Sequence, residues 1–387
     1  MFSSRTDWQR KSNRLTDALN ERKRSGKTIL DLTNSNPTAC GIAYPVNEIL
    51  RAFSSDEIVR YQPDPQGLLS ARNEVCKYYS GKGISLDPSQ VFLTASTSEA
   101  YLIVFKLLCN VGDNVLVPQP SYPLFDYLAQ INDVELKPYS LRYDGEWRVD
   151  LESLKHAVTK STRAIVLIHP HNPTGMFLKN DEFDAIQKLA SQNNLALIVD
   201  EVFSEYAFSG DPMRLNSAAA YSNVLSFTLN GISKMLGLPQ MKLGWIAVTG
   251  PEKSRKEASA RLEIICDTFL SVNTPVQVAL PELMRSGLSA QKNILERVKK
   301  NYVTLAETFP SNAACSALKS EGGWYGILRV PRTKRDEDRC LELLEKEGVL
   351  VHPGYYYDFE EEGYLVLSLL TEEKVFEEAA KKIAKAI

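Results

Sequence analysis

The segment Leu195-Ala196-Leu197-Ile198-Val199 is a continuous apolar run that ends directly in two carboxylates, Asp200 and Glu201. Three further runs of this kind lie between residues 90 and 250, at 91–94, 114–117 and 164–168, with longer helical patterns between them. Continuous rather than alternating hydrophobicity is typical of strands covered on both faces, and alternation of strands with helices indicates a parallel sheet. The sequence therefore predicts an α/β fold whose large, mostly parallel sheet is covered by helices.

The pattern changes after residue 280. A charged helical pattern over 290–307 is followed by a strand pattern within 322–330, a helix over 335–348, a short strand, a turn at Pro353-Gly354 and a terminal helix. This order indicates a smaller α+β domain, and 387 residues suit two domains. We expect an N-terminal segment of residues 1–45 that packs on the small domain, a large domain of residues 46–280 and a small C-terminal domain of residues 281–387.

Composition excludes several classes of function. A net charge of −3 and a pI near 6.0 give no sign of a nucleic-acid or membrane partner. The opening residues are polar and lack the apolar core of a signal peptide, so we expect a soluble, cytoplasmic protein. The six cysteines are scattered and the four histidines lack metal-ligand spacing, so neither a disulfide framework nor a metal site is expected.

Lys234 and Asp200 are the residues that carry the most chemical information. Lys234 closes Asn230-Gly231-Ile232-Ser233-Lys234 shortly after the apolar run 224–227, and Asn172-Pro173-Thr174-Gly175 follows another predicted strand. A lysine can form a Schiff base with an aldehyde, and a carboxylate beside a pyridine nitrogen keeps that nitrogen protonated, which makes the ring an electron sink. Since strand ends of parallel sheets gather at one edge, the three segments together indicate an enzyme that uses pyridoxal 5'-phosphate.

The chain resembles the fold type I pyridoxal-phosphate enzymes, specifically the class I/II aminotransferases, over roughly residues 30–370. The resemblance rests on motifs in the family's order, namely Tyr61 to Gly67, Thr94 to Ala100, Pro120-Ser121-Tyr122, Asn172 to Gly175, Asp200-Glu201, Ser233-Lys234 and Gly244-Trp245. It implies a sheet of the seven-stranded type in a large cofactor-binding domain. It also implies ping-pong transfer of an amino group from an amino acid or amine to a keto acid, in a homodimer with shared active sites.

Residue by residue, the resemblance implies four catalytic groups. Lys234 would be the Schiff-base lysine and then the base that moves a proton on the substrate–cofactor pair. Asp200 would pair with the pyridine nitrogen, with a helix cap at the strand end as the structural alternative. Asn172 would donate to the ring oxygen O3′, and Tyr122 would stack on the ring, unless it is an ordinary core tyrosine.

The cofactor phosphate has its own candidate residues. Ser96-Thr97-Ser98 begins a predicted helix, whose N–H groups and hydroxyls suit an anion, although the same residues also suit an ordinary N-cap. The resemblance adds Tyr61, which would reach the phosphate in the neighbouring subunit, and Lys242, where the family usually has arginine. Gly231 stands where a phosphate-binding serine is common, so one contact is expected to be absent.

Two further departures concern the cofactor oxygen O3′ and the substrate carboxylate. Phe203 stands where the family has a tyrosine that hydrogen-bonds O3′, and Tyr206 is a candidate to compensate. Val366 occupies the position of the arginine that binds the substrate carboxylate, so either another cation takes that role or the substrate is not an ordinary α-amino acid. Arg329, on a predicted neighbouring strand, is the candidate cation.

Ser35 and Tyr325 complete the expected substrate contacts, and aromatic residues around Pro353-Gly354 suggest an apolar entrance or ordinary packing between domains. His169 is expected to be a hydrogen-bonding neighbour of the site more than a proton carrier.

Alternative functions remain open at this point. The changes at Phe203 and Val366 also suit a lyase that performs β-elimination, of the C–S lyase type, or an amino-acid oxidase on the same fold. A cofactor-sensing DNA-binding regulator is disfavoured because no basic recognition helix precedes the matched region. A dinucleotide-binding dehydrogenase is disfavoured because no G-x-G-x-x-G follows a predicted strand.

Overall fold

The computed structural model describes residues 1–8, 12–121 and 123–387. Its largest element is an eight-stranded sheet in the order β2 (Val91–Thr94), β9 (Gly244–Thr249), β8 (Ser226–Gly231), β7 (Ala196–Asp200), β6 (Thr162–Ile168), β3 (Asn114–Gln119), β4 (Glu135–Tyr143) and β5 (Trp147–Val149). Every pair from β8 to β4 is parallel, whereas β9 runs against both of its neighbours and β5 returns along β4. The predicted, mostly parallel sheet is thereby confirmed, and the short β5 brings it to eight strands.

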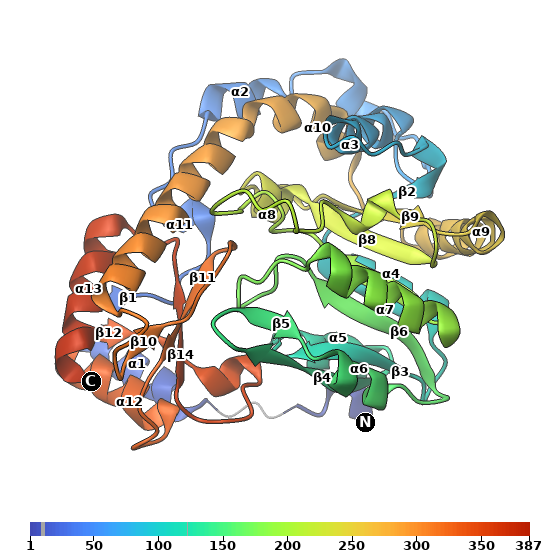
Figure 1. Cartoon of the computed structure of the whole chain (residues 1–387). Coiled ribbons are helices and arrows are strands. Elements are labelled where there is room, and N and C mark those ends of the chain that lie inside the picture. Colours follow the sequence, from blue (N-terminus) through green and yellow to red (C-terminus); the bar gives the residue numbers. More distant parts are fainter. Residues whose placement is uncertain (9–11, 122) are drawn as a thin grey trace.

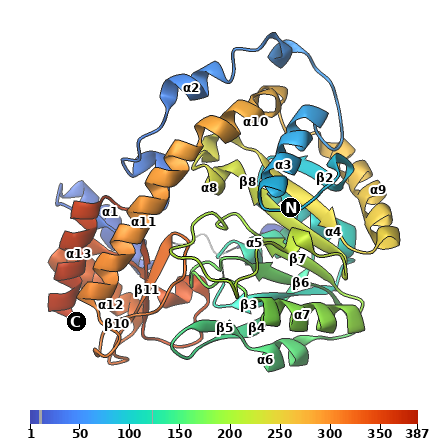
Figure 2. The same cartoon turned by 45° about the horizontal axis from the view of Figure 1, so that its top comes forward.

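Helices cover both faces of this sheet (Figures 1 and 2). On one face, Val166 and Ile168 of β6 pack in the same cluster as residues of α4 (Thr97–Leu108), α5 (Phe125–Ile131) and α9 (Glu252–Phe269). On the other face, Ile165 and Leu167 pack with α6 (Leu151–Ala157) and α7 (Asn180–Gln192). Alternate residues of one strand are thus buried on opposite sides, which is why the strand sequences are continuously apolar.

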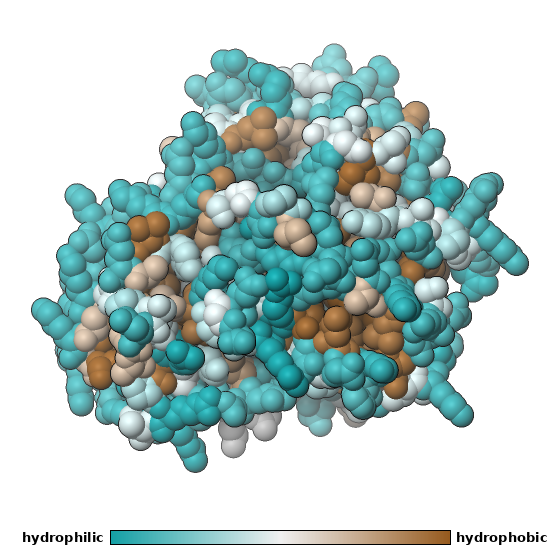
Figure 3. Space-filling model, viewed as in Figure 1, coloured by the Kyte–Doolittle hydropathy of each residue, from teal (hydrophilic) through white to brown (hydrophobic). Residues whose placement is uncertain are grey.

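A third cluster closes the β2–β9 end of the sheet. Leu93 and Trp245 pack there against three helices, α3 (Leu69–Gly81), α8 (Ile232–Met235) and α10 (Thr274–Ser286). The short α2 (Val46–Arg51) lies beside α10 (Figure 1). The face of the molecule in Figure 3 is mostly hydrophilic, with small apolar areas scattered over it.

The C-terminal part forms an antiparallel sheet in the order β10 (Ser316–Ala317), β11 (Tyr325–Arg329), β14 (Tyr364–Ser368) and β13 (His352–Pro353). Its helices are α11 (Leu288–Thr308), α12 (Asp336–Glu342) and α13 (Glu373–Ala386). The helix expected over 335–348 is α12 followed by a π-helical turn at Leu343–Glu347. The small α+β unit expected from the sequence is therefore present.

The N-terminal segment lies against this C-terminal part. Strand β1 (Leu30–Asp31) pairs in parallel with β12 (Val349–Leu350), and α1 (Arg14–Arg24) contacts α12. The exact domain boundaries at residues 45 and 280 stay a prediction. No helix within the described ranges is long and apolar enough to cross a membrane.

Candidate active site

Three neighbouring parallel strands deliver the predicted chemical groups to one edge of the sheet. Strand β6 ends at Ile168 shortly before Asn172, β7 ends at Asp200 itself, and β8 continues to Gly231 before α8 carries Lys234. The apolar run 224–227 overlaps only the first two residues of β8, and the buried residues that follow it alternate between polar and apolar. The carboxyl ends of parallel strands meet at one edge, so residues far apart in sequence share one site.

These residues line one cavity of about 310 Å³, which is near the lower end of the range for small-molecule sites. Its lining combines the strand ends with the start of α4 and with segments from the N- and C-terminal parts: Ser35, Ser96, Thr97, Ser98, Tyr101, Phe125, Leu128, Ile168, Asn172, Asp200, Val202, Phe203, Gly231, Ser233, Lys234, Leu243, Gly244 and Tyr325. Among these described lining residues, Asp200 and Lys234 alone carry a formal charge.

Asp200 is a buried carboxylate with few donors. The backbone N–H of Val202 donates to its Oδ1 at 3.1 Å. Burial raises the pKa of Asp200 to about 6, against the opposing effects of the Val202 N–H, the Tyr101 hydroxyl and Lys234. A desolvated carboxylate of this kind is stabilised by a cationic partner, and a protonated pyridine nitrogen would supply one.

Lys234 is held in place through its backbone. The Tyr206 hydroxyl donates to the carbonyl oxygens of Lys234 at 2.7 Å and of Met235 at 3.1 Å. The Lys234 Nζ lies 5.1 Å from the centroid of the Trp324 ring. Burial lowers the pKa of the Lys234 ammonium, and nearby Asp200 opposes that shift. A lowered pKa favours the neutral amine, which is the form that can act as nucleophile and base.

The remaining cofactor contacts are the start of α4 and Asn172. Ser96 caps the helix, since its Oγ accepts the Glu99 N–H at 3.2 Å, and the first turn of the helix lines the cavity. The predicted N-cap and the predicted anion site are therefore compatible. Asn172 is buried, and its Oδ1 has no hydrogen-bond partner among the described residues. A lysine, a desolvated carboxylate, a buried amide and a helix N-terminus in one cavity fit pyridoxal phosphate.

Two of the predicted substrate residues also line the cavity, and a third, Arg329, lies elsewhere. Ser35 and Tyr325 are lining residues. Arg329 is not brought to the cavity: it is exposed at the other end of β11, four residues or about 13 Å from Tyr325. The expectation that it replaces the missing arginine is therefore corrected. Tyr122 lies outside the described residues.

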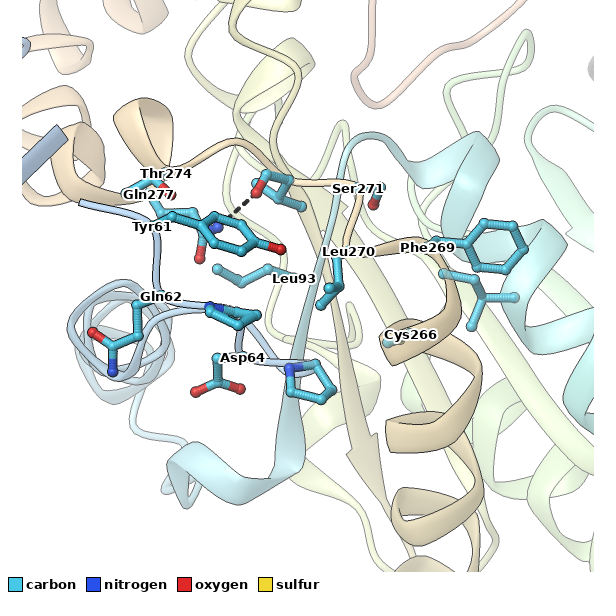
Figure 4. A pocket seen from close by; sticks show the side chains of 15 residues that line it. Tyr61, Gln62, Asp64, Leu93, Cys266, Phe269, Leu270, Ser271, Thr274 and Gln277 are labelled. Atoms are coloured by element: carbon cyan, nitrogen blue, oxygen red, sulfur yellow. Dashed lines mark hydrogen bonds between the residues drawn. The ribbon is translucent and has the colours of Figure 1, made fainter. Parts of the chain in front are cut away.

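Tyr61 lies outside the main cavity of the single chain. It is 76% exposed and lines a separate pocket together with Leu93, Leu270 and Gln277 (Figure 4). That pocket adjoins the start of α4, because the Ser271 hydroxyl donates to Glu99 at 2.7 Å. An exposed tyrosine at this place is available to a second copy of the chain.

The two departures at the phosphate end have different structural settings. Gly231 is hemmed in, since a Cβ at this residue would meet Gly244 Cα at 2.8 Å and the Leu243 carbonyl at 2.9 Å. A serine there would therefore require the backbone of β9 to move. Lys242 is exposed and left-handed, with φ of 55°, and does not line the cavity, although the next two residues do.

Phe203 and Val366, the other two departures, are both packed against neighbouring side chains. Phe203 lines the cavity and packs edge-on against Trp324, with ring centroids 5.1 Å apart. Tyr206 does not supply the hydroxyl that Phe203 lacks, because its own hydroxyl binds the carbonyls of α8. Val366 is 1% exposed in an apolar cluster that includes Ile327 and Tyr357.

Sequence reasoning missed Tyr101, Phe125 and Leu128 as lining residues. Tyr101 lies four residues after Thr97 in α4, and Leu128 lies three residues after Phe125 in α5, so helical spacing from a predicted site residue would have found Tyr101. Phe125 and Leu128 lie on α5, in which the sequence predicts no site residue from which to count.

His169 has a structural role. Its Nδ1 accepts the Leu178 N–H at 3.0 Å and its Nε2 lies 2.9 Å from the Leu215 carbonyl, so both ring nitrogens are engaged. Burial lowers the pKa of His169 to about 3. No group of three or more metal-ligating side chains occurs in the part of the chain that the structure describes.

Comparisons with known proteins agree with this geometry. The glutamate-pyruvate aminotransferase AlaA of Haemophilus influenzae is 28% identical over 371 residues, which cover 93% of this chain and 91% of that protein. The S-alkyl-thiohydroximate lyase of Arabidopsis thaliana is 28% identical over 356 residues, covering 85% and 74%. The solved alanine aminotransferase of Pyrococcus furiosus has a TM-score of 0.89 at 22% identity, covering 100% and 99%, which shows a shared fold.

The family model for class I and II aminotransferases matches residues 27–383. Enzymes of this family depend in general on pyridoxal phosphate. The match spans nearly the whole chain, from before β1 to the last turn of α13, and includes every cavity-lining residue. The chain therefore belongs to the class I and II aminotransferases.

Proposed function

We propose that this enzyme moves an amino group between an amino acid or amine and a carbonyl acceptor, a keto acid in the usual reaction of the family, by a ping-pong mechanism. The observation that carries the proposal is the meeting of Lys234, Asp200 and Asn172 at one cavity beside the N-terminus of α4. Within the described lining, Lys234 is the only amine and Asp200 is the only carboxylate that can balance a positive charge. The lysine is therefore the residue we expect to hold pyridoxal phosphate.

Each residue has a defined task in this proposal. Bound pyridoxal phosphate supplies the aldehyde that takes up the amino group and the ring that accepts an electron pair. Lys234, with its lowered pKa, would hold the cofactor and then move the proton on the donor's carbon. Asp200 would pair with the pyridine nitrogen, and Asn172 would donate to the ring oxygen O3′. The N–H groups and hydroxyls of residues 96–98 would bind the phosphate.

We also propose a homodimer in which Tyr61 contacts the phosphate of the partner's site. Its support is the 76% exposure of Tyr61 beside the pocket that adjoins α4, with the exposed apolar Phe269 in the same pocket. Mixing a Lys234→Ala subunit with a Tyr61→Ala subunit should restore part of the activity that each variant lacks, because one site of the mixed dimer is intact. A cytoplasmic location stays a prediction from the sequence.

The test of the reaction is the absorbance of purified enzyme as amino acids and simple amines are added, followed by identification of the cofactor by mass. Conversion to pyridoxamine phosphate is the expected outcome. Lys234→Ala should remove the borohydride-reducible link between protein and cofactor and lower the rate by at least about 10³-fold. Retention of that link in the variant would contradict the assignment of Lys234.

A lyase or oxidase reaction is the second candidate. It is favoured by Phe203, which places a ring without a hydroxyl at the cavity, and by the similarity to the Arabidopsis lyase. β-Elimination would release a keto product without an added acceptor, and oxidation would consume oxygen. If either result is observed while the cofactor remains pyridoxal phosphate, the reaction assigned to the enzyme is elimination or oxidation and not transamination.

A further inference from the structure

The cavity is poor in positive charge. Asp200 and Lys234 are the charged members of the described lining, and the proposed function assigns both of them to the cofactor. The other polar side chains of the lining are hydroxyls and the amide of Asn172. An ionised carboxylate on the substrate would therefore enter a desolvated space in which no fixed cation of this chain remains for it.

Ser35, Phe203 and Tyr325 line the cavity with uncharged side chains, two of which carry hydroxyls, and we call these three residues the substrate wall. Burial raises the pKa of the Tyr325 hydroxyl, and the nearby side chains of Ser35 and Tyr357 oppose that shift. Tyr357 in turn lies with its hydroxyl 3.3 Å from Nδ1 of His352. Burial lowers the pKa of His352 to about 4, so the chain of groups that begins at Ser35 is uncharged at neutral pH.

The residue behind the substrate wall is apolar, and the cations nearest in the fold are placed or engaged elsewhere. Val366, on the strand paired with β11, is opposite both Ile327 and His352 and is buried. Two cations of this part of the chain are engaged elsewhere: Arg297 donates to the carbonyls of Cys40 and Leu370, and Arg329 is exposed at the far end of β11. On the other side of the site, Lys82 forms an ion pair with Glu205 at 2.6 Å.

The geometry points to an amino donor that presents an uncharged hydrogen-bonding group, a hydroxyl or a primary amide, to Ser35 and Tyr325. The carbon that loses its amino group would carry no ionised carboxylate. This inference rests on the proposed function, and it narrows the donor from amino acids and amines in general to amino alcohols and amino amides. A hydroxyl can both donate and accept, which matches a wall made of hydroxyls.

The transfer balances for such a donor. The donor loses its amino group and the hydrogen on the same carbon, takes up the oxygen of one water and leaves as a carbonyl compound. The amino group and the electron pair of the broken C–H bond stay in the loaded enzyme. A carbonyl acceptor then takes both, together with protons, and releases one water. No further oxidant or reductant is needed.

The inference is tested with donors that share one carbon skeleton. Alanine, alaninamide and 2-aminopropan-1-ol are offered separately to the loaded enzyme, and kcat/KM for conversion of the cofactor is measured by absorbance. We expect the amide or the alcohol to exceed alanine by at least about tenfold, a difference typical of one charge-assisted contact. Phenylalanine and phenylalaninol form a second pair with the same expected order.

The outcomes separate the two proposals. A preference for the amino acids in both sets would overturn this inference and leave transamination standing. If no donor of either class converts the cofactor, transamination itself fails, and the inference fails with it.

The role of the wall is tested by removing one oxygen atom. 2-Aminopropan-1-ol and butan-2-amine differ by a hydroxyl in place of a methyl group, so their ratio of kcat/KM measures recognition of the hydroxyl. We expect Tyr325→Phe, and separately Ser35→Ala, to reduce this ratio by at least about threefold. Tyr302→Phe, which removes a hydroxyl bonded to the Ser320 N–H away from the cavity, is the matched control. An unchanged ratio in both wall variants would overturn the inference.

Discussion

The two sides of the cavity follow the aminotransferase pattern to different degrees. The side formed by Asn172, Asp200, Lys234 and the start of α4, here called the cofactor wall, carries the residues that the sequence resemblance predicts for these positions. Phe203 of the substrate wall and Val366 behind it depart from the prediction, at the positions expected to bind O3′ and the substrate carboxylate. The cofactor wall is built by adjacent strand ends, whereas the substrate wall is assembled from distant segments. The chemistry and the recognition of a substrate can therefore change independently.

After the loss of Lys234 itself, the largest expected effect comes from neutralising one of two adjacent buried carboxylates. Asp200 lines the cavity, whereas Glu201 binds the Ser217 hydroxyl at 2.8 Å and the Ala218 N–H at 2.7 Å. Asp200→Asn should lower the transamination rate by roughly 10²–10³-fold, because it removes the counter-charge of the protonated ring. The cofactor link to Lys234 should remain. Rates are measured in single-turnover experiments with saturating donor.

Glu201→Gln is the matched control for that experiment, since it neutralises the neighbouring carboxylate away from the cavity. Its rate should stay within about threefold of the parent. Equal losses in the two variants would mean that buried charge in general, and not the pairing of Asp200 with the ring, supports the reaction. The cofactor wall would then lose its distinct role.

Glu201 also predicts how stability depends on pH. Burial raises its pKa from an ordinary 4.5 to about 7 in the folded protein. The unfolded chain therefore releases this proton at lower pH than the folded chain, and stability is lost as pH rises from about 4.5 to 7. The loss amounts to about 3 kcal/mol at most. Glu201→Gln should remove this slope, as measured by urea unfolding at pH 5 and pH 8. Parallel pH profiles of parent and variant would contradict the prediction.

The strand ends of the cofactor wall could be predicted from sequence because hydrophobicity directly encodes them. Residues 91–94 are apolar at nearly every position and form β2 without any shift. Strand β8 was less visible, since Thr228 and Asn230 are buried polar residues, and the Asn230 Oδ1 is satisfied by the Gly231 N–H at 2.7 Å. Local hydrogen bonds of this kind allow polar residues in a core strand, and a hydropathy pattern does not show them.

The substrate wall could be predicted only in part. Ser35 and Tyr325 were expected to contact substrate, but their meeting at one cavity joins residues that are far apart in the chain. The prediction for Arg329 was wrong because it used only the fact that Arg329 and Val366 lie on adjacent strands. The position of a residue along its strand decides whether its side chain reaches the cavity. The direction of the Tyr206 hydroxyl likewise depends on where α8 lies, which no local pattern specifies.

A smaller effect is expected from Tyr206, which supports the cofactor wall from behind. Tyr206→Phe should cost about 1 kcal/mol of stability and lower the rate by roughly three- to tenfold, since Lys234 loses one restraint. The cost is modest because the two carbonyls keep other donors: Gly237 N–H bonds to Lys234 at 3.0 Å, and Gln291 bonds to Met235 at 2.8 Å. Thermal unfolding and the rate with a single donor are measured together. A rate loss with unchanged affinity for the cofactor would identify Tyr206 as a positioning residue.

The smallest effect is expected at Lys242, an exposed residue that directly precedes two lining residues of the cavity. Its ammonium is exposed, while Leu243 and Gly244 line the cavity, so any contact with the cofactor phosphate is screened by water. Lys242→Ala should weaken binding of pyridoxal phosphate about threefold, as measured by absorbance titration, and Lys253→Ala, at another exposed lysine, should leave it unchanged. A loss above about 30-fold would mean that the ammonium is desolvated in the loaded enzyme, because exposed pairs do not contribute that much. The cofactor wall would then extend to the loop before β9, and it would retain a phosphate-binding cation despite the loss of arginine.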